Sequence, residues 1–297
     1  MENVSEWLAR RFEENRAHLQ QVAYRMLGSF DAAEDAVQEA WLRLSRTENN
    51  HIENLGGWLT TVVARICLDV LRARHSKREE LYGLNIPDFI VSPEKGPEYQ
   101  VALADSVGLA LLIVLDTLTP AERLAFVLHD MFALPFEEIA GIVGRSTGAA
   151  RQLASRARRR IRGAAIPEAD LTRQRKVVNA FVAAAREGDF DALIAVLDPQ
   201  VVLRADRGPA IQGMRGAPAV AEQAMVFSKL VQKTEPVIVN GAPGIISWLP
   251  NGKPMAVLGF VVAQDKIVKI YVISNPDRLA RLTKLSVLSD RTDSSID

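Results

Sequence analysis

The sequence has few cysteines, no long apolar runs and few histidines, and so lacks the features of disulfide-bonded, membrane-spanning and metal-binding proteins. A single cysteine, Cys67, excludes an intramolecular disulfide, and four histidines offer few metal ligands, so we expect neither a metal nor a cofactor. No apolar run reaches the length of a membrane span, and the charged N-terminus lacks the apolar segment of a signal peptide. We therefore expect a cytoplasmic protein in which Cys67, within an apolar helical stretch, is a core residue.

The chain also has no net excess of positive or negative charge, because 36 Lys+Arg residues balance 36 Asp+Glu residues. Any affinity for nucleic acid must therefore come from local clusters of charge. With 297 residues, of which 48% are hydrophobic, the chain is long enough for two or three domains with buried cores.

The most concentrated basic cluster lies in residues 135–162, which are predicted to form a helix–turn–helix. Gly144 suits the left-handed end of the first helix, and Ser146 or Thr147 can cap the second. The second helix and the turn before it carry no acid and seven arginines: Arg145, Arg151, Arg156, Arg158, Arg159, Arg160 and Arg162. A helix this basic suits a DNA major groove, and a solvated helix face is the simpler alternative.

Three amphipathic helices are predicted before this motif, at about residues 5–27, 31–46 and 56–78. The second has an acidic face near its start, which is either a partner surface or a solvated first turn. The third has a tryptophan, Trp58, and a cationic end. These features suit a nucleic-acid strand, and the alternative is a core tryptophan with cations that complement the helix C-terminus.

The helical pattern stops over residues 79–99, where three prolines and two glycines indicate an extended linker. It resumes at residues 101–118. Thr119 and Pro120 then provide a cap and a first-turn proline for the next helix.

Four segments together resemble the extracytoplasmic-function (ECF) group of the sigma-70 family. They are DAAEDAVQEAWLRL (31–44), GGWLTTVVARICLDVLR (56–72), LTPAERLAFVLHDMFALPFEEIAGIVGRS (118–146) and ASRARRRIR (154–162). The resemblance implies two all-α domains, sigma domain 2 at residues 1–80 and sigma domain 4 at residues 101–165, joined by a linker at residues 81–100. It also implies a bacterial transcription factor that is not an enzyme, with RNA polymerase core and promoter DNA as partners.

The same resemblance implies three sets of site residues. The core polymerase surface comprises Asp31, Glu34, Asp35, Gln38, Glu39 and Trp41. The −10 DNA surface comprises Trp58, Arg65, Asp69, Arg72, Arg74 and Arg78. The −35 DNA surface comprises Arg145, Ser146, Thr147, Ala149, Ala150, Arg151, Ser155, Arg156 and Arg159.

Residues 171–285 are predicted to form an α+β domain, with the order α-α-β-α followed by several strands. REGDFDALIAVLDPQVVLRAD (186–206) and KIVKIYVISNPDRL (266–279) resemble the SnoaL-like conical barrels, which a subset of ECF sigma factors carries at the C-terminus. The terminal motif of that subset corresponds to a regulatory tail of Asn275, Pro276, Asp277, Arg278 and Leu279. The subset's linker motif is not matched by LYGLNIP, and residues 286–297 are expected to be a disordered tail.

A conical barrel can enclose an apolar pocket for an unidentified small-molecule ligand, and a filled core is the alternative. Candidate lining residues are Phe181, Val202, Met225, Phe227, Trp248, Phe260 and Tyr271. Candidate general bases are Asp206, Glu222 and Asp265, and none has a recognisable catalytic partner.

The hypothesis from the sequence is a sigma factor whose C-terminal domain docks on the sigma domains through the linker and the tail, and so sets their spacing. One rival is a one-component helix–turn–helix regulator that senses a small molecule and binds DNA tightly without polymerase. The other is a SnoaL-like isomerase or hydrolase whose turnover depends on Asp206 or Glu222.

Overall fold

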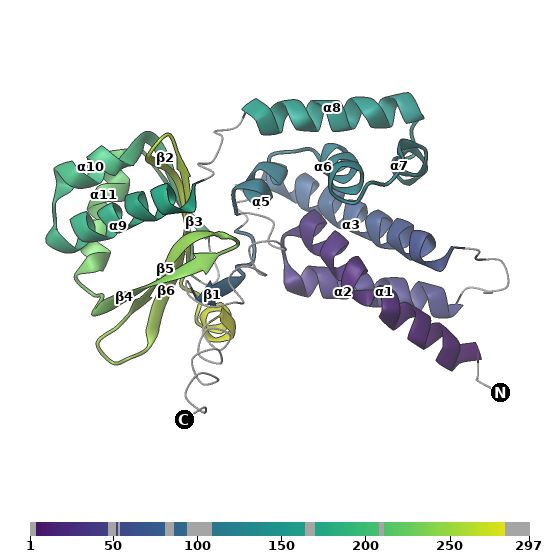
Figure 1. Cartoon of the computed structure of the whole chain (residues 1–297), viewed down its shortest axis with the longest axis horizontal. Helices are drawn as coiled ribbons and strands as arrows, with labels where there is room; N and C mark the ends of the chain where they lie inside the picture. The colour runs from purple at the N-terminus through teal and green to yellow at the C-terminus, as the bar shows by residue number, and fades with distance from the viewer. Residues whose placement is uncertain are drawn as a thin grey trace. The chain divides into compact units, whose positions relative to one another are not determined.

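The computed structural model describes residues 4–46, 52, 54–80, 86–93, 109–163, 170–207 and 211–282 (Figure 1). The chain forms two compact units. The first comprises Met1–Gly83 and Leu112–Ala164, and the second comprises Leu84–Leu111 and Ala165–Asp297. Residues 101–108 of the helix predicted at residues 101–118 and the whole of the predicted tail at residues 286–297 lie outside the described residues. The two units are described separately below.

The first unit begins with three packed helices, α1 (Val4–Leu27), α2 (Phe30–Arg46) and α3 (Leu55–Glu80). Gly28 has a φ of 67°, which lets the chain turn sharply between α1 and α2. Cys67 is fully buried on α3, as expected, and burial raises the pKa of its thiol to about 12. A thiol held protonated in this way is a packing group and not a nucleophile.

Four helices and one π-helical turn complete the first unit: α5 (Leu109–Leu115), α6 (Pro120–Phe126), η2 (Val127–Met131), α7 (Phe136–Val143) and α8 (Thr147–Gly163). Thr119 caps α6 as predicted, because its hydroxyl accepts from the Glu122 amide at 3.3 Å. The Glu122 carboxylate accepts from the Thr119 amide at 3.2 Å and so completes a capping box.

The predicted helix–turn–helix is confirmed at α7 and α8. Gly144 ends α7 with a φ of 68°, in the left-handed region. The Ser146 hydroxyl accepts from the Ala149 amide at 3.3 Å at the start of α8. Leu153 and Ala157 are buried on the inner side of α8, which leaves its basic side outward.

The second unit has the predicted α+β architecture, with three helices against one face of a curved sheet (Figure 1). The helices are α9 (Leu171–Glu187), α10 (Phe190–Val196) and α11 (Ala217–Ser228). The strands are β1 (Val91–Pro93), β2 (Leu197–Asp206), β3 (Ile211–Arg215), β4 (Lys233–Val239), β5 (Ala242–Trp248), β6 (Pro254–Ala263) and β7 (Lys266–Ile273). The sheet order is β1-β4-β5-β6-β7-β2-β3, in which β2 and β7 are parallel and the other pairs are antiparallel.

An apolar core joins these helices to the sheet. Phe181 of α9 meets Phe260 of β6 edge to face, with ring centroids 5.6 Å apart. Val178, Leu193 and Ile270 are fully buried in the same core. The core fixes the sheet that carries the cavity and the linker contacts described below.

Gly244, on β5, lies where the neighbouring strands leave no room for a side chain. A Cβ there would approach Val239 Cγ2 to 2.5 Å and the Leu258 carbonyl oxygen to 2.7 Å. We therefore expect Gly244→Ala to lower the free energy of unfolding of the second unit by about 1–3 kcal/mol. Urea titration followed by Trp248 fluorescence, with the other tryptophans replaced, measures this change. An unfolding midpoint equal to that of the parent protein would contradict the steric explanation.

Candidate nucleic-acid and polymerase interfaces

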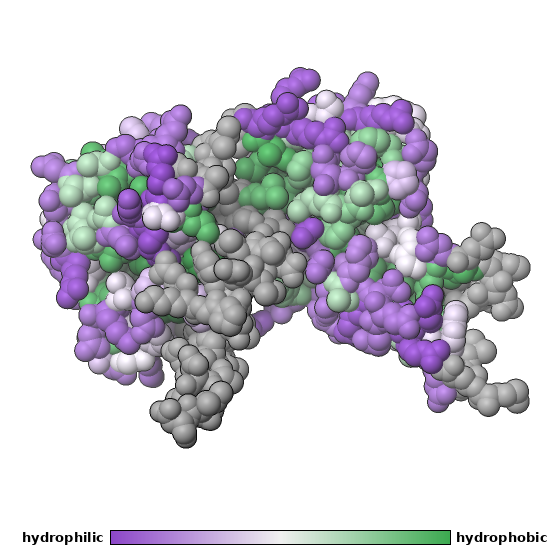
Figure 2. All heavy atoms as spheres, viewed as in Figure 1, coloured by the Kyte–Doolittle hydropathy of each residue, from purple (hydrophilic) through white to green (hydrophobic). Residues whose placement is uncertain are grey.

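The outer side of α8 carries most of the side chains predicted to contact −35 DNA, and Figure 2 shows that its outer edge is hydrophilic. Six of these residues are exposed and two, Thr147 and Ala149, are half-buried. The exposed ones are Arg145, Ser146, Arg151, Ser155, Arg156 and Arg159. Ala150 is different, because it is fully buried against the rest of the domain. Its side chain faces the core, so the prediction that Ala150 belongs to the −35 DNA surface is wrong.

Several arginines of α8 are tied to acids of the same unit. Arg156 and Arg160 both pair with Glu122, at 3.6 Å and 3.2 Å. Arg158 makes a bidentate contact with Asp130, at 2.6 Å and 3.1 Å. Because the Glu122 side chain is only 5% exposed, these pairs help to fix α8 on α6. The sequence pattern did not reveal this role.

Other arginines face solvent with weaker ties. Arg151 lies 3.4 Å from Glu137, with both side chains more than half exposed. A pair of that kind contributes about 0–1 kcal/mol and is easily exchanged for a phosphate. Arg145 and Arg159 make no ion pair with any residue that the structure describes. These three arginines, one in the turn before α8 and two on α8, are best placed to bind DNA.

The predicted −10 surface lies on α3, and its members differ in environment. Arg65, Asp69 and Arg72 are exposed, whereas Trp58 is half-buried. Arg74 is half-buried and donates from Nη1 to the Leu27 carbonyl oxygen at 3.0 Å, so it helps to hold the end of α1. The side chain of Arg78 lies outside the described residues.

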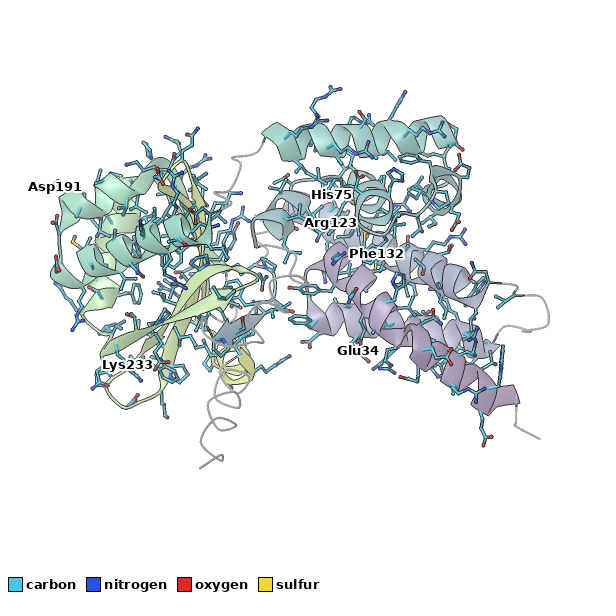
Figure 3. All side chains as sticks on the ribbon, in the orientation of Figure 1. Glu34, His75, Arg123, Phe132, Asp191 and Lys233 are labelled. Atoms are coloured by element: carbon cyan, nitrogen blue, oxygen red, sulfur yellow. The ribbon has the colours of Figure 1, made fainter. Side chains whose placement is uncertain are left out.

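The two helical domains of the first unit are packed together. Arg123 of α6, with a side chain 4% exposed, donates to the Arg25 carbonyl oxygen of α1 at 3.2 Å and pairs with Asp116 at 3.3 Å. Phe132 receives His18 edge-on at 5.3 Å and the Arg25 guanidinium at 4.9 Å (Figure 3). Partial burial and then the charge of Arg25 lower the pKa of His18.

One predicted DNA contact takes part in this packing. Arg65 donates from Nη2 to the Gly141 carbonyl oxygen of α7 at 3.4 Å. A residue of the −10 surface thus contacts the first helix of the helix–turn–helix. The first unit is consequently a closed arrangement, in which the two predicted DNA-binding domains are in contact.

The predicted polymerase surface lies on α2, where three residues are exposed at helical spacing: Asp31, Asp35 and Gln38. Leu42 continues the row and is 45% exposed. The set of residues implied by the family resemblance did not include this apolar residue. An acidic row that ends in an exposed leucine suits a basic protein surface with an apolar contact.

The other members of the predicted polymerase surface are engaged within the domain. Glu34 accepts from Arg16 at 3.0 Å and from Gln20 at 2.6 Å (Figure 3). Glu39 pairs with Arg43 at 2.8 Å. The Trp41 ring packs 5.0 Å from that of Phe12.

In the second unit, part of the predicted linker is a strand of the sheet. Residues 91–93 form β1 and pair antiparallel with β4, in the register Val91↔Val239, Ser92↔Ile238 and Pro93↔Val237. Ile86 and Phe89 are buried beside it.

Asn240, in the tight turn after β4, also binds this segment. Its amide donates to the Ile90 carbonyl oxygen at 2.8 Å, and its Nδ2 donates to the Asp88 carbonyl oxygen at 3.2 Å. Its side-chain oxygen accepts from the Ile90 amide. Asn240 is 1% exposed, so these bonds are shielded from water.

Arg278, from the predicted regulatory tail, links the linker to the sheet. Its Nη2 lies 2.7 Å from the Asp88 carboxylate and 3.3 Å from the Pro87 carbonyl oxygen. Its Nη1 lies 2.6 Å from the carboxylate of Asp206 at the end of β2. Asn275 orients the tail, because its side-chain oxygen accepts from the amides of Asp277 and Arg278 at 3.0 Å and 3.1 Å.

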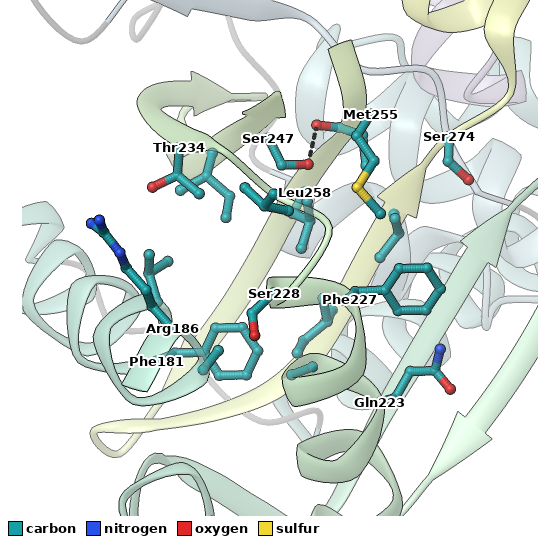
Figure 4. A pocket seen from close by; sticks show the side chains of 18 of the residues that line it. Phe181, Arg186, Gln223, Phe227, Ser228, Thr234, Ser247, Met255, Leu258 and Ser274 are labelled. Carbon is teal, nitrogen blue, oxygen red and sulfur yellow. Dashed lines mark hydrogen bonds between the residues drawn. The ribbon is translucent and has the colours of Figure 1, made fainter. Parts of the chain in front are cut away.

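A cavity lies between the sheet, α9 and α11 (Figure 4). Phe181 and Phe227 line it, as the sequence suggested. The other five candidates do not, and Phe260 and Tyr271 are core residues with 1% exposure. The filled-core alternative therefore holds for Phe260 and Tyr271.

The candidate general bases are not directed into this cavity. Asp206 pairs with Arg278, Asp265 pairs with Arg173 at 2.6 Å, and Glu222 is exposed. None of the three is among the residues that line the cavity. Within the described ranges, no cluster of three or more His, Cys, Asp or Glu side chains is arranged for a metal ion, and no helix has the length and apolar character to cross a membrane.

Comparison with known proteins gives consistent matches in both units. Residues 11–77 match the family Sigma-70 region 2, and residues 109–161 match the family Sigma-70, region 4. The probable ECF RNA polymerase sigma factor SigI of Mycobacterium tuberculosis is 38% identical over 272 residues, which are 89% of this chain and 92% of that protein. The ECF RNA polymerase sigma factor SigJ of the same organism is 36% identical over 289 residues, which are 90% and 91% of the two chains. The crystal structure of SigJ has a TM-score of 0.67 at 33% identity, covering 92% of this chain and 98% of that one.

Proposed function

Because this chain belongs to the extracytoplasmic-function group of the sigma-70 family, we propose that its second unit regulates the initiation that its first unit directs. As a sigma factor, the chain brings RNA polymerase core to promoter DNA and selects the start site. We place this activity in the cytoplasm, where RNA polymerase works.

Each surface of the first unit takes one role in the proposal. The row of Asp31, Asp35, Gln38 and Leu42 binds core polymerase, with Glu34 and Trp41 holding the helix in place against α1. The exposed residues of α3, with Trp58, bind −10 DNA. The start of α8 enters the major groove at −35, where helix N-termini contact base edges. Charge complementarity supports these assignments, since acids suit a basic protein surface and arginines suit phosphates.

Regulation rests on one observation: residues 86–93 of the segment that joins the two sigma domains belong to the second unit, and residues 91–93 form a strand of its sheet. Two DNA-binding modules engage one promoter together only when the segment between them can span their sites. A segment tied to the sheet by β1, Asn240 and Arg278 has less reach than a free one. The closed first unit, in which Arg65 contacts Gly141, agrees with a restricted spacing.

We propose that core polymerase removes this restriction, because it binds the form of the protein in which residues 86–93 are released from the second unit. Such a shift requires that polymerase bind that form more tightly than the closed one. The second unit then acts as a built-in inhibitor, in the place of a separate anti-sigma protein. A small molecule in the cavity of the second unit is the additional partner that we propose.

Run-off transcription with core polymerase on genomic fragments tests the proposal. The full chain is expected to confer start-site selection, and a chain ending after Asp170 is expected to give at least about fivefold more transcript, within the usual range of coupling between sites. Equal output from the two forms would reject regulation by the second unit. Absence of start-site selection with both forms would reject the assigned roles of the first unit.

A further inference from the structure

The cavity of the second unit has apolar walls and the size of a small ligand. Its walls include Phe181, Leu203, Phe227, Ile245, Leu258 and Ile270 (Figure 4). Its volume is about 160 Å³. An apolar protein cavity of roughly 150 Å³ holds benzene, so this one accommodates an aromatic ring or a short alkyl chain.

The charged residues that line the cavity all have the same sign. They are Arg186, Arg207 and Lys233, and no aspartate or glutamate is among the lining residues. Arg207 is held in place by Phe227, with its guanidinium 4.7 Å from the centre of that ring. Lys233 lies 2.6 Å from Glu235, so its charge is partly compensated. Arg207 is therefore the cation best prepared to bind an anionic group.

The three serine hydroxyl groups of the lining already donate their protons to protein carbonyl oxygens. Ser228 donates to Met225 at 2.9 Å, Ser247 to Ala256 at 3.2 Å, and Ser274 to Asp206 at 3.0 Å. These serines are thus poor donors to a ligand. The other donors of the lining, the amides of Gln223 and Gln232 and the hydroxyl of Thr234, are neutral, so the cations are the strongest partners that the cavity offers to an anion. A ligand without an anion leaves these cations unmatched.

We propose that this cavity binds a small apolar molecule that carries a carboxylate, with the apolar part between α9, α11 and the sheet and the carboxylate at Arg207. The proposal gives a chemical class to the small-molecule partner named above and rests on that part of the proposed function. Binding itself needs neither polymerase nor DNA. Its test is therefore separate from the transcription assay.

Isothermal titration of the full chain with two matched pairs of probes tests the inference: octanoate against 1-octanol, and phenylacetate against 2-phenylethanol. The members of each pair share an apolar body and differ in charge. We expect each acid to bind roughly tenfold more tightly than its alcohol, as one charge-assisted contact provides. The advantage is expected to shrink at high salt, because salt screens the exposed guanidinium.

Three variants locate the site. Arg207→Gln is expected to weaken the acids about tenfold and leave the alcohols unchanged. Ala224→Phe, which fills the cavity from α11, is expected to abolish binding of all four probes. Arg215→Gln is the control, since Arg215 is exposed on β3 and does not line the cavity.

Equal binding of acids and alcohols, or no binding of any probe at millimolar concentration, would overturn the inference. So would an effect of Arg215→Gln as large as that of Arg207→Gln. If Ala224→Phe fails to fold, the Arg207→Gln comparison decides alone. If the titration shows no binding, the proposal that the linker regulates initiation still stands. If the transcription assay shows no regulation, the proposal that the cavity binds a carboxylate still stands.

Discussion

Asp35→Arg is expected to abolish co-elution with core RNA polymerase and to lower run-off transcription by roughly 100-fold, in the range measured for close charge pairs at protein interfaces. Asp35 is exposed on α2 and makes no ion pair with the described residues. Its charge is therefore available to a partner. Reversing it places a cation against the basic surface that the proposal assigns to polymerase.

The neighbouring acids provide a graded comparison. Glu34 is already bound by Arg16 and Gln20, and Glu39 by Arg43. Glu34→Gln and Glu39→Gln are expected to reduce transcription by less than Asp35→Arg. If all three variants were equally defective, the loss would reflect the stability of α2 and not its exposed row.

Glu14→Arg on α1 is the matched control. Glu14 is an exposed acid, 48% exposed and paired with Arg11 at 2.8 Å, and it lies outside the row on α2. This variant is expected to co-elute with core polymerase as the parent does. Co-elution of a folded Asp35→Arg protein, verified by circular dichroism, would refute the assigned surface.

The sequence could predict the helix–turn–helix because each of its signals is local. Gly144 ends one helix, Ser146 caps the next, and apolar spacing identifies the buried sides. The Thr119 capping box is equally local, since its two partners are three residues apart. Such features depend on neighbouring residues alone, and the structure confirms them.

Side-chain roles that depend on other elements were not predictable in the same way. Arg156 had the same local signature as Arg159, yet only Arg156 pairs with Glu122. Ala150 was placed near DNA by its position in the motif, yet it points into the domain. Arg74 likewise binds a carbonyl oxygen of another helix. These outcomes depend on how α6, α1 and α8 pack, which no local pattern encodes.

The position of strand β1 in the sheet could not be predicted from local sequence either, because its partner is far away in the chain. Its segment was predicted to be extended, which its prolines favour, but nothing nearby indicated its partner. Ile90 and Asn240 bind each other from positions 150 residues apart. The tail motif predicted a role for Arg278, and only the structure gives its partners, Asp88 and Asp206.

The second large effect is expected from Arg278→Glu, which should release residues 86–93 from the sheet. Arg278 lies between two carboxylates, and the Asp206 side chain is only 7% exposed. The substitution replaces the guanidinium with a third carboxylate beside Asp88 and Asp206, so three like charges repel one another. Breaking a fully buried pair costs about 3–5 kcal/mol, and the partial exposure of Arg278 and Asp88 reduces this to an expected shift of about tenfold to 100-fold in the docking equilibrium.

Two measurements follow that shift independently. Limited proteolysis between α3 and α5 reports release of the segment, and run-off transcription reports its consequence, expected as about tenfold more transcript. Lys253→Glu, an exposed change of the same sign in the turn between β5 and β6, is expected to alter neither. Faster proteolysis with unchanged transcription would show that the segment is held but that its release does not regulate initiation.

A charge exchange separates the ion pair from general damage to the fold. In Asp88→Arg with Arg278→Glu, the contact between these two positions is restored with reversed charges, while Asp206 loses its partner. We therefore expect the double variant to recover part of the docking, so that its proteolysis rate lies between those of the parent and Arg278→Glu. Direct partners couple in such cycles by about 0.5–3 kcal/mol, whereas unrelated defects add. Simple addition of the two single effects would mean that Asp88 and Arg278 act independently, so that their ion pair does not hold the segment.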